Sequence, residues 1–287
     1  MTAPATGPAV DRDLPLDAHL HTDQSPDSDV PIDVYCAAAV ERAIAELAIT
    51  DHVDFDRAAP AYRFASFEVR ERAVREAAER WAGRVAVRFG VEITYESRRE
   101  AEIRDHLARH RYDYVIGSVH VMSYSPYTPS TVARFVAGKT LSEIVRPYFD
   151  EVLGAIRSGL FDTIGHLDYV KRYLHPHRAP AEFAAAPELY EPLLRALVEG
   201  GVGLEMNTSG LRQSPGETYP PASVVGRFRE LGGRAVTVGS DAHRAPSFAF
   251  GLAAGYRAVE AAGLEARISL GHPLIGRMPN SRAAGSL

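Results

Sequence analysis

Seven short apolar runs recur along the chain, and each is followed by a longer stretch with helical spacing of its apolar residues. Short runs bounded by turn residues are typical of buried strands, and apolar positions three to four residues apart are typical of amphipathic helices. The predicted strands lie at 16–20, 47–50, 85–93, 114–119, 163–165, 203–206 and 235–239. The predicted helices lie at 32–46, 67–81, 98–109, 141–158, 188–199, 222–231 and 248–262. This alternation predicts an α/β protein with a parallel sheet, either open and doubly wound or closed into a barrel.

The pattern also predicts one domain with a tail at each end. Residues 14–276 contain no Gly/Ser/Pro-rich linker and no repeat of solenoid length, so we expect a single domain. Within it, the irregular stretches 120–139 and 173–187 are expected to be loops. Residues 1–13 are predicted to be a disordered N-terminal tail and residues 277–287 a mobile C-terminal tail. The length of 287 residues suits an α/β barrel, which commonly needs about 250.

Composition and charge narrow the function classes. The chain has 37 acidic and 32 basic residues, a net charge of −5, and lacks the basic footprint that nucleic-acid binders show. No apolar run approaches the roughly 18 residues of a membrane helix. The first residues lack the features of a signal peptide, so we expect a cytoplasmic protein with no membrane partner. The single cysteine, Cys36, excludes an internal disulfide and is interpreted as a packed core thiol.

Polar side chains that can bind metal ions follow all seven predicted strands. The carboxyl ends of parallel strands share one face of an α/β fold, where active sites are built. The residues at these ends include His19, His21, His52, Glu92, His120, His166, Glu205, Asn207, Asp241 and His243. The spacing of His19 and His21 also puts both imidazoles on the same face of a strand.

Most of these residues have an ordinary interpretation when each is considered alone. His120 and His166 would serve as hydrogen-bonded core histidines, and Glu92 as a strand-end carboxylate paired with an arginine. Together they align six histidines and several carboxylates at seven strand ends, which predicts a polynuclear metal site. Imidazole and carboxylate ligands without cysteine suit Zn, Fe or Mn in an open site. Two such ions about 3.5–4 Å apart can clamp a phosphoryl group.

Other histidines receive less specific interpretations. His106 and His110 have the spacing of two ligands on one helix face, but Leu107 stands where a metalloprotease motif has glutamate. We therefore expect both to be surface residues. His175 and His177 flank Pro176 in a predicted loop and are expected to be solvated.

The motifs at the strand ends resemble those of the polymerase and histidinol phosphatase (PHP) superfamily. Asp-x-His-x-His, Thr-Asp-His, Gly-x-Glu, the His120 and His166 motifs and Ser-Asp-Ala-His occur in the family's order between residues 16 and 243. The segments 116–120, 158–166 and 205–212 are similar to the histidinol-phosphatase branch in particular. The resemblance implies a distorted (β/α)7 TIM-like barrel, in agreement with the seven predicted strands, and a site for three metal ions.

The resemblance also implies a ligand set for each ion. The first set is His19, His21, Glu92 and Asp241. The second set is Glu92, as a bridge, with His120 and His166. The third set is His52, His243 and Asp27. Asp27 departs from the pattern, because many members have a histidine six residues after the second histidine of the first motif; a carboxylate can change the metal preference or affinity there. Asp17 and Asp51 are expected to orient ligand imidazoles.

The resemblance and the metal chemistry together predict a metal-dependent phosphomonoesterase with two to three divalent ions. The implied reaction is hydrolysis of L-histidinol phosphate to L-histidinol and phosphate in histidine biosynthesis, by attack of a metal-bridging hydroxide on phosphorus. The residues expected to be catalytic are Glu92, Asp241 and His243. The expected contacts to the small phosphorylated substrate are Arg212, Lys171, Arg172 and Asn207. Arginine leads this group because its planar fork matches two phosphate oxygens.

Two alternatives stay open at this point. One is a PHP phosphodiesterase or exonuclease that acts on nucleotides or oligonucleotides; the acidic composition and the helical segment before Gly165 argue against it. The other is a non-catalytic metal-binding PHP module, against which the full ligand set argues. The residues identify neither the acid that protonates the leaving alkoxide nor the oligomeric state.

Overall fold

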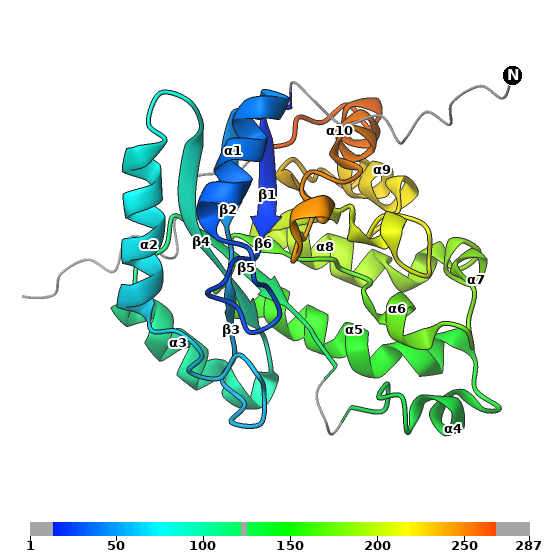
Figure 1. The fold of residues 1–287 in the computed structure, drawn as a ribbon. Coiled ribbons are helices and arrows are strands. Elements are labelled where there is room, and N and C mark those ends of the chain that lie inside the picture. Colours follow the sequence, from blue (N-terminus) through cyan, green and yellow to red (C-terminus); the bar gives the residue numbers. More distant parts are fainter. Residues whose placement is uncertain (1–13, 122–124, 268–287) are drawn as a thin grey trace, which may run out of the picture.

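The structure, a computed structural model, describes residues 14–121 and 125–267. Within these residues, eight strands form one parallel sheet around which the helices are arranged (Figure 1). The strands are β1 (Leu16–Leu20), β2 (Glu46–Ile49), β3 (His52–Val53), β4 (Ala86–Thr94), β5 (Tyr114–Ser118), β6 (Thr163–Ile164), β7 (Gly203–Asn207) and β8 (Val236–Gly239). The expected tails, 1–13 and 277–287, lie outside the described residues.

The eight strands occupy seven positions in the sheet, in the order β1-β2-β4-β5-β6-β7-β8. The short strand β3 continues β2, because both strands pair with β4. Strand β2 pairs with the beginning of β4, and β3 pairs with Glu92 and Ile93 further along it. The interruption falls at Thr50 and Asp51, whose carbonyl oxygens both face the backbone N–H of Glu92, at 3.1 and 3.4 Å. This irregularity places His52 directly beside Glu92 in the register of the two strands.

The sheet closes between its first and last strands. Beyond the end of β8, Asp241 N donates to His19 O at 2.8 Å, and His21 N donates to Ala242 O at 3.0 Å. A parallel bridge between Leu20 and Ala242 accompanies these bonds. Closure therefore occurs at the carboxyl ends of the strands, and the prediction of a distorted seven-stranded barrel is confirmed.

The helices cover the outside of the barrel (Figure 1). They are α1 (Ile32–Arg42), α2 (Phe67–Arg80), α3 (Glu100–Arg109), α4 (Val132–Val136), α5 (Leu141–Ser158), α6 (Val170–Leu174), α7 (Pro180–Ala184), α8 (Glu191–Gly200), α9 (Ala222–Glu230) and α10 (Leu252–Ala261). The short 3-10 turns are Ser97–Arg99, Pro187–Leu189, Ser209–Arg212 and Ala245–Ser247. None of these described helices is long and apolar enough to cross a membrane.

Helix α5 shows how the sequence determines where one of these outer helices begins and ends and which face it buries. Thr140 and Glu143 form a reciprocal capping box at its start, and Gly159 ends it with a φ of 64°. A capping box satisfies two backbone N–H groups that the first turn leaves without partners. Residues such as Ile144, Tyr148 and Val152 are buried along one face. The same one-sided pattern buries Cys36 on α1, as predicted.

Several predicted boundaries differ from the structure. The helix predicted at 32–46 ends at Arg42, because Ala43 adopts a left-handed conformation and its N–H closes the last turn. The helix predicted from 248 begins at Leu252, after Gly251 with a φ of 74°. The two predicted loops contain the short helices α4 and α7, and the end of α6. These helices have only five residues each, too short for a clear hydrophobic period in the sequence.

Candidate metal centre

The carboxyl ends of the strands bring nine predicted residues to one face of the barrel. They come from β1, β3, β4 and the segments that directly follow β1, β5, β6 and β8. The residues are His19, His21, Asp27, His52, Glu92, His120, His166, Asp241 and His243. All but Asp27 are buried or partly buried, and they form three clusters.

The first cluster consists of His19, His21, Glu92 and Asp241. Nε2 of His19 and Nε2 of His21 are 3.0 Å apart, and they lie 3.2 and 3.4 Å from Glu92 Oε2. Asp241 Oδ1 lies 3.8 and 3.5 Å from the same two nitrogens. Ligand atoms around a tetrahedral ion with bonds near 2.0–2.1 Å are about 3.3 Å apart. The spacing of this cluster therefore fits one four-coordinate metal ion.

The second cluster uses the other oxygen of Glu92. Oε1 of Glu92 lies 2.9 Å from His166 Nε2 and 3.5 Å from His120 Nε2. Thr94 Oγ1 lies 2.9 Å from Nδ1 of His120, on the side of the ring away from Glu92. The two oxygens of Glu92 thus face two different groups of imidazoles. This is the arrangement that a bridging carboxylate requires.

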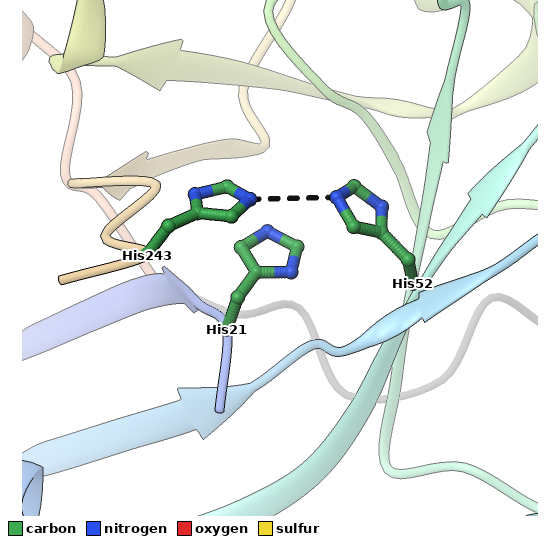
Figure 2. Close-up of side chains that lie close together, drawn as sticks. All are labelled: His21, His52 and His243. Carbon is green, nitrogen blue, oxygen red and sulfur yellow. Dashed lines mark hydrogen bonds between the residues drawn. The ribbon is translucent and has the colours of Figure 1, made fainter. Parts of the chain in front are cut away.

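The third cluster consists of His52, His243 and Asp27. Nε2 of His52 and Nε2 of His243 are 3.5 Å apart and point toward each other beside the ring of His21 (Figure 2). Asp27 Oδ2 lies 3.4 Å from His52 Nε2 and 3.2 Å from His243 Nε2. Asp27 is half exposed. Its carboxylate completes a three-ligand group of the spacing that a metal ion needs.

The three clusters are coupled through shared rings. His52 lies 3.0 Å from Glu92 Oε2 through Nδ1 while its Nε2 belongs to the third cluster. The ring of His21 stacks on those of His52 and His243, with centroids 4.2 and 4.0 Å away. Among the described residues, three overlapping groups have side-chain atoms close enough together to bind one metal ion each. The groups are His19, His21 and Glu92; His52, Glu92 and His120; and His21, His52 and His243.

Two of these residues have an unfavourable backbone conformation. His166 has a φ of 26° and Asp241 a φ of 54°, and residues other than glycine rarely adopt positive φ values. Each follows a strand of the barrel, β6 or β8. Such strain persists only where the surrounding structure holds the residue in place, and it is concentrated at functional sites.

The pKa values of the residues in the clusters are shifted because carboxylates and imidazoles are buried together. Burial disfavours the charged form of Glu92, but the facing rings of His19, His52 and His120 hold its pKa well below the usual range. Burial also opposes a charge on His19, yet Glu205, Glu92 and Asp241 raise its pKa well above 6.5. The pKa of His120 falls to about 3 because burial dominates there. Metal ions would replace the protons that these groups share.

Glu205 is a supporting residue that was not assigned a role from the sequence. It is fully buried on β7, and its Oε1 lies 2.6 Å from Nδ1 of His19. Its Oε2 accepts hydrogen bonds from His166 N at 2.7 Å and from Asn207 Nδ2 at 3.1 Å. The sequence did contain a signal for this role. Glu205 is a carboxylate in the middle of the buried strand Gly203–Asn207, and a buried charge needs a partner.

The two predicted orienting residues act differently from the prediction. Asp17 accepts backbone N–H bonds from Ser240 at 2.8 Å and from Ala249 at 3.3 Å, and among the described residues it bonds to no imidazole. Asp51 accepts a hydrogen bond from Ser25 Oγ at 2.9 Å, and this hydroxyl lies 3.4 Å from His21 Nδ1. Asp51 therefore acts on His21 through Ser25, whereas Asp17 holds the backbone before Asp241.

A cavity of about 720 Å³ opens over the clusters. We call it the active-site cavity, and its lining includes His52, Glu92, His120, Asp241 and His243. Two of the four predicted substrate contacts, Arg172 and Arg212, also line it. Arg172 contacts the hydroxyl of Tyr169, and Tyr169 lines the same cavity. A phosphate ester at the clusters would therefore have a guanidinium close by.

The other two predicted contacts lie behind the lining. Lys171 is 2% exposed, and its Nζ lies 2.6 Å from both Asp168 Oδ2 and Glu217 Oε1. Asn207 is fully buried and donates to Glu205 Oε2 at 3.1 Å, while its Oδ1 accepts from Ser209 N. Their polar groups already have protein partners, so these two side chains support the site from below.

Arg212 has a second role besides lining the cavity. Its two terminal nitrogens donate to Ser240 O at 2.8 Å and to Asp241 O at 2.7 Å. The guanidinium thus holds the backbone at Asp241, the residue of the first cluster that has a left-handed φ. Its remaining N–H groups are available to a phosphoryl oxygen, because a guanidinium has five donors.

The chain is similar to known proteins along most of its length. The model of the PHP domain family matches residues 17–209, a range that includes every cluster residue except Asp241 and His243. A probable histidinol-phosphatase of Deinococcus radiodurans is 32% identical over 241 residues, which cover 83% of this chain and 89% of the relative. The histidinol-phosphatase of Lactococcus lactis is 28% identical over 229 residues, which cover 79% of this chain and 84% of the relative.

A solved structure also has this fold. The crystal structure of histidinol phosphate phosphatase from Lactococcus lactis, which holds zinc, L-histidinol and phosphate, matches with a TM-score of 0.76. The match covers 88% of this chain and 95% of that chain at 24% sequence identity. At this identity the likeness concerns the fold alone.

Proposed function

The chain belongs to the PHP domain family, and we propose that it is a metal-dependent phosphomonoesterase that hydrolyses histidinol phosphate to histidinol and phosphate. The observation that carries the proposal is the position of Glu92, whose two oxygens face two groups of imidazoles on the floor of the active-site cavity. Paired cationic sites of this kind suit a phosphomonoesterase, because the transferring phosphoryl group is strongly anionic. The names of the Deinococcus and Lactococcus relatives support the substrate.

The donor set supports two to three divalent ions of zinc, iron or manganese. Six imidazoles and three carboxylates, without cysteine, suit these metals and leave positions open for water and substrate. When bound, the ions would lower the pKa of a shared water and polarise the phosphoryl oxygens. The proposed ligand sets are the three clusters described above, with Glu92 common to the first two.

The residues of this chain would have distinct tasks in the reaction. Arg172 would bind a phosphoryl oxygen that points away from the clusters, since its guanidinium faces the cavity. Arg212 would hold Asp241 in place through the two carbonyl groups it binds and would offer its remaining donors to phosphate. Glu205 would keep Nδ1 of His19 protonated, so that Nε2 faces the first cluster as a ligand.

The substrate assignment is tested by comparing esters on purified, metal-loaded protein. Phosphate release is measured from histidinol phosphate, from ten other small phosphomonoesters, from a phosphodiester and from a short oligonucleotide. We expect histidinol phosphate to have the highest kcat/KM, with the diester and oligonucleotide near background. A higher kcat/KM for the diester or the oligonucleotide would overturn the proposal in favour of phosphodiester chemistry. No turnover of any ester by fully metal-loaded protein would indicate a non-catalytic module.

A place in histidine biosynthesis follows from this substrate and is proposed with it. A cytoplasmic location is likewise part of the proposal.

A further inference from the structure

A second cavity, of about 560 Å³, lies beside the active-site cavity, and the two share Asp54 and Ala61 in their linings. Its other walls come from residues 53–70, which include the start of α2, from α3, and from Tyr112. Helices α2 and α3 lie on the same flank of the barrel (Figure 1). This volume is in the range of cavities that hold small organic molecules.

The second cavity contains a buried arginine without an ion-pair partner. Arg70 is only 3% exposed, and its side chain makes no hydrogen bond or salt bridge with any described residue. Its Nε is fully enclosed, and Asp51 and Asp54 act on the guanidinium only from a distance. An unpaired buried charge is costly, and native proteins rarely keep one without a function.

A carboxylate with one unpartnered oxygen, that of Asp54, lies in the wall between the two cavities, and Thr94 is a hydrogen-bond partner of the same carboxylate. Oδ1 of Asp54 is buried and has no hydrogen-bond partner among the described residues. The other acidic groups nearby are engaged or exposed: Glu102 pairs with Arg99, Asp105 pairs with Arg109, and Glu68 is exposed. Of the other cations in the lining, Arg63 is exposed and lies over the Tyr62 ring, and Arg109 pairs with Asp105. Among the described lining residues, Arg70 and Asp54 therefore carry the buried side-chain atoms without hydrogen-bond partners.

Aromatic and imidazole rings form much of the remaining lining. His110 stacks on Phe67 with ring centroids 4.3 Å apart, and His106 packs edge-on against Phe55 at 5.5 Å. His106 also lies 2.9 Å from the Tyr112 hydroxyl, and burial lowers its pKa to about 4, so the ring is neutral at pH 7. His106 and His110 are thus partly buried in a cavity wall, where the sequence suggested surface residues.

We propose that the second cavity binds a small amino acid with a flat ring side chain, its carboxylate on Arg70 and its ammonium on Asp54. A zwitterion of this kind satisfies both unpartnered groups at once, and its ring packs against the aromatic walls. A phosphate ester would satisfy Arg70 but would be repelled by Asp54, and a simple amine would leave Arg70 unpaired. This inference does not depend on the proposed function of the metal centre.

The test is calorimetric titration of the metal-loaded protein with three matched probes. L-phenylalanine has both charges, 3-phenylpropionate lacks the ammonium, and 2-phenylethylamine lacks the carboxylate. Inorganic phosphate is present at saturating concentration, so that the active-site cavity is filled. We expect saturable binding of phenylalanine and at least about tenfold weaker binding of the other two, because each lacks one charge-assisted hydrogen bond.

Variants locate the binding. Arg70→Met should abolish phenylalanine binding, whereas Arg72→Met, an exposed arginine of α2 outside the lining, should leave it unchanged. If Arg70→Met does not fold, Ala65→Phe gives the same test by filling the cavity, since Ala65 lines only the second cavity. No saturable phenylalanine binding to the wild-type protein would overturn the inference. Equal affinity for all three probes, or unchanged binding in the folded Arg70→Met or Ala65→Phe variant, would do the same.

Discussion

Glu205 and His19 form the closest buried contact behind the first cluster: Oε1 lies 2.6 Å from Nδ1, and neither side chain is exposed to solvent. The carboxylate keeps the proton on Nδ1 and leaves Nε2 free to bind a metal ion. Because Oε2 of the same carboxylate accepts the N–H of His166, Glu205 also holds the backbone at a ligand of the second cluster. One residue outside the ligand sets thus positions members of two clusters.

We predict that Glu205→Gln lowers metal affinity and kcat/KM by about 10–100-fold, the usual cost of losing a group that orients a metal ligand. The amide has the same shape but no charge, so the ring of His19 loses its electrostatic support. Metal content after dialysis against a weak chelator and kcat/KM measure the effect. Glu217→Gln is the control, because that carboxylate pairs with Lys171 away from the clusters. Wild-type values for both properties in Glu205→Gln would contradict this role.

We predict that Glu92→Ala is more damaging than Asp27→Ala. The oxygens of Glu92 face the first and second clusters, so its loss should release two ions, whereas the carboxylate of Asp27 lies beside His52 and His243 of the third. Metals per chain and kcat are measured for both variants. Equal loss of activity with full metal occupancy in both proteins would show that Glu92 is not a bridge.

Arg172 and Lys171 are adjacent on α6 but should respond in opposite ways. Arg172→Met should lower kcat/KM by about 10–100-fold through lost phosphate contact, with unchanged metal content and stability. Lys171→Met should cost about 3–5 kcal/mol of unfolding free energy, because it leaves Asp168 buried without its cation. Denaturant unfolding and steady-state kinetics separate the two effects. An unchanged kcat/KM for metal-loaded Arg172→Met would transfer the phosphate contact to Arg212.

Gly239 permits the close approach of β8 to the first cluster. A Cβ at this position would lie 2.4 Å from Cβ of His19 and 2.9 Å from Oε1 of Glu205. Gly239→Ala should therefore displace His19, reduce metal content and destabilise the protein by about 1–3 kcal/mol. Gly226→Ala on α9 is the matched control, since a Cβ there meets open space. Normal metal content in Gly239→Ala would show that the first cluster tolerates a shifted His19.

The residues of the three clusters could be located from the sequence because their positions depend on topology. His19 and Glu92 lie near the carboxyl end of a strand, and His166 and Asp241 follow one. Parallel strands bring their carboxyl ends together whatever the details of packing. The parallel sheet followed from the same alternation of strands and helices, and the choice of a barrel over an open sheet came from the resemblance to the PHP superfamily. The exact ends of the helices could not be predicted from this pattern. Ala43, for example, ends α1 in a left-handed conformation that alanine seldom adopts.

The supporting and substrate-contacting residues could not be located in this way. Lys171 and Arg172 are neighbours in sequence, and only the orientation of α6 decides that one pairs with Asp168 while the other faces the cavity. The role of Glu205 depends on a contact with His19, 186 residues earlier in the chain. Such pairings arise from packing between distant elements, which local patterns do not encode.

The most direct test of the account is phosphate release from histidinol phosphate before and after metal removal. Purified protein is assayed as isolated, after exhaustive treatment with a chelator, and after return of zinc, iron or manganese, with Glu92→Ala assayed in parallel. We predict that activity disappears with the metal, returns with at least one of the ions, and cannot be restored in Glu92→Ala. Full activity in the metal-free protein, or none in fully metal-loaded wild-type protein, would contradict a metal-dependent histidinol phosphate phosphatase.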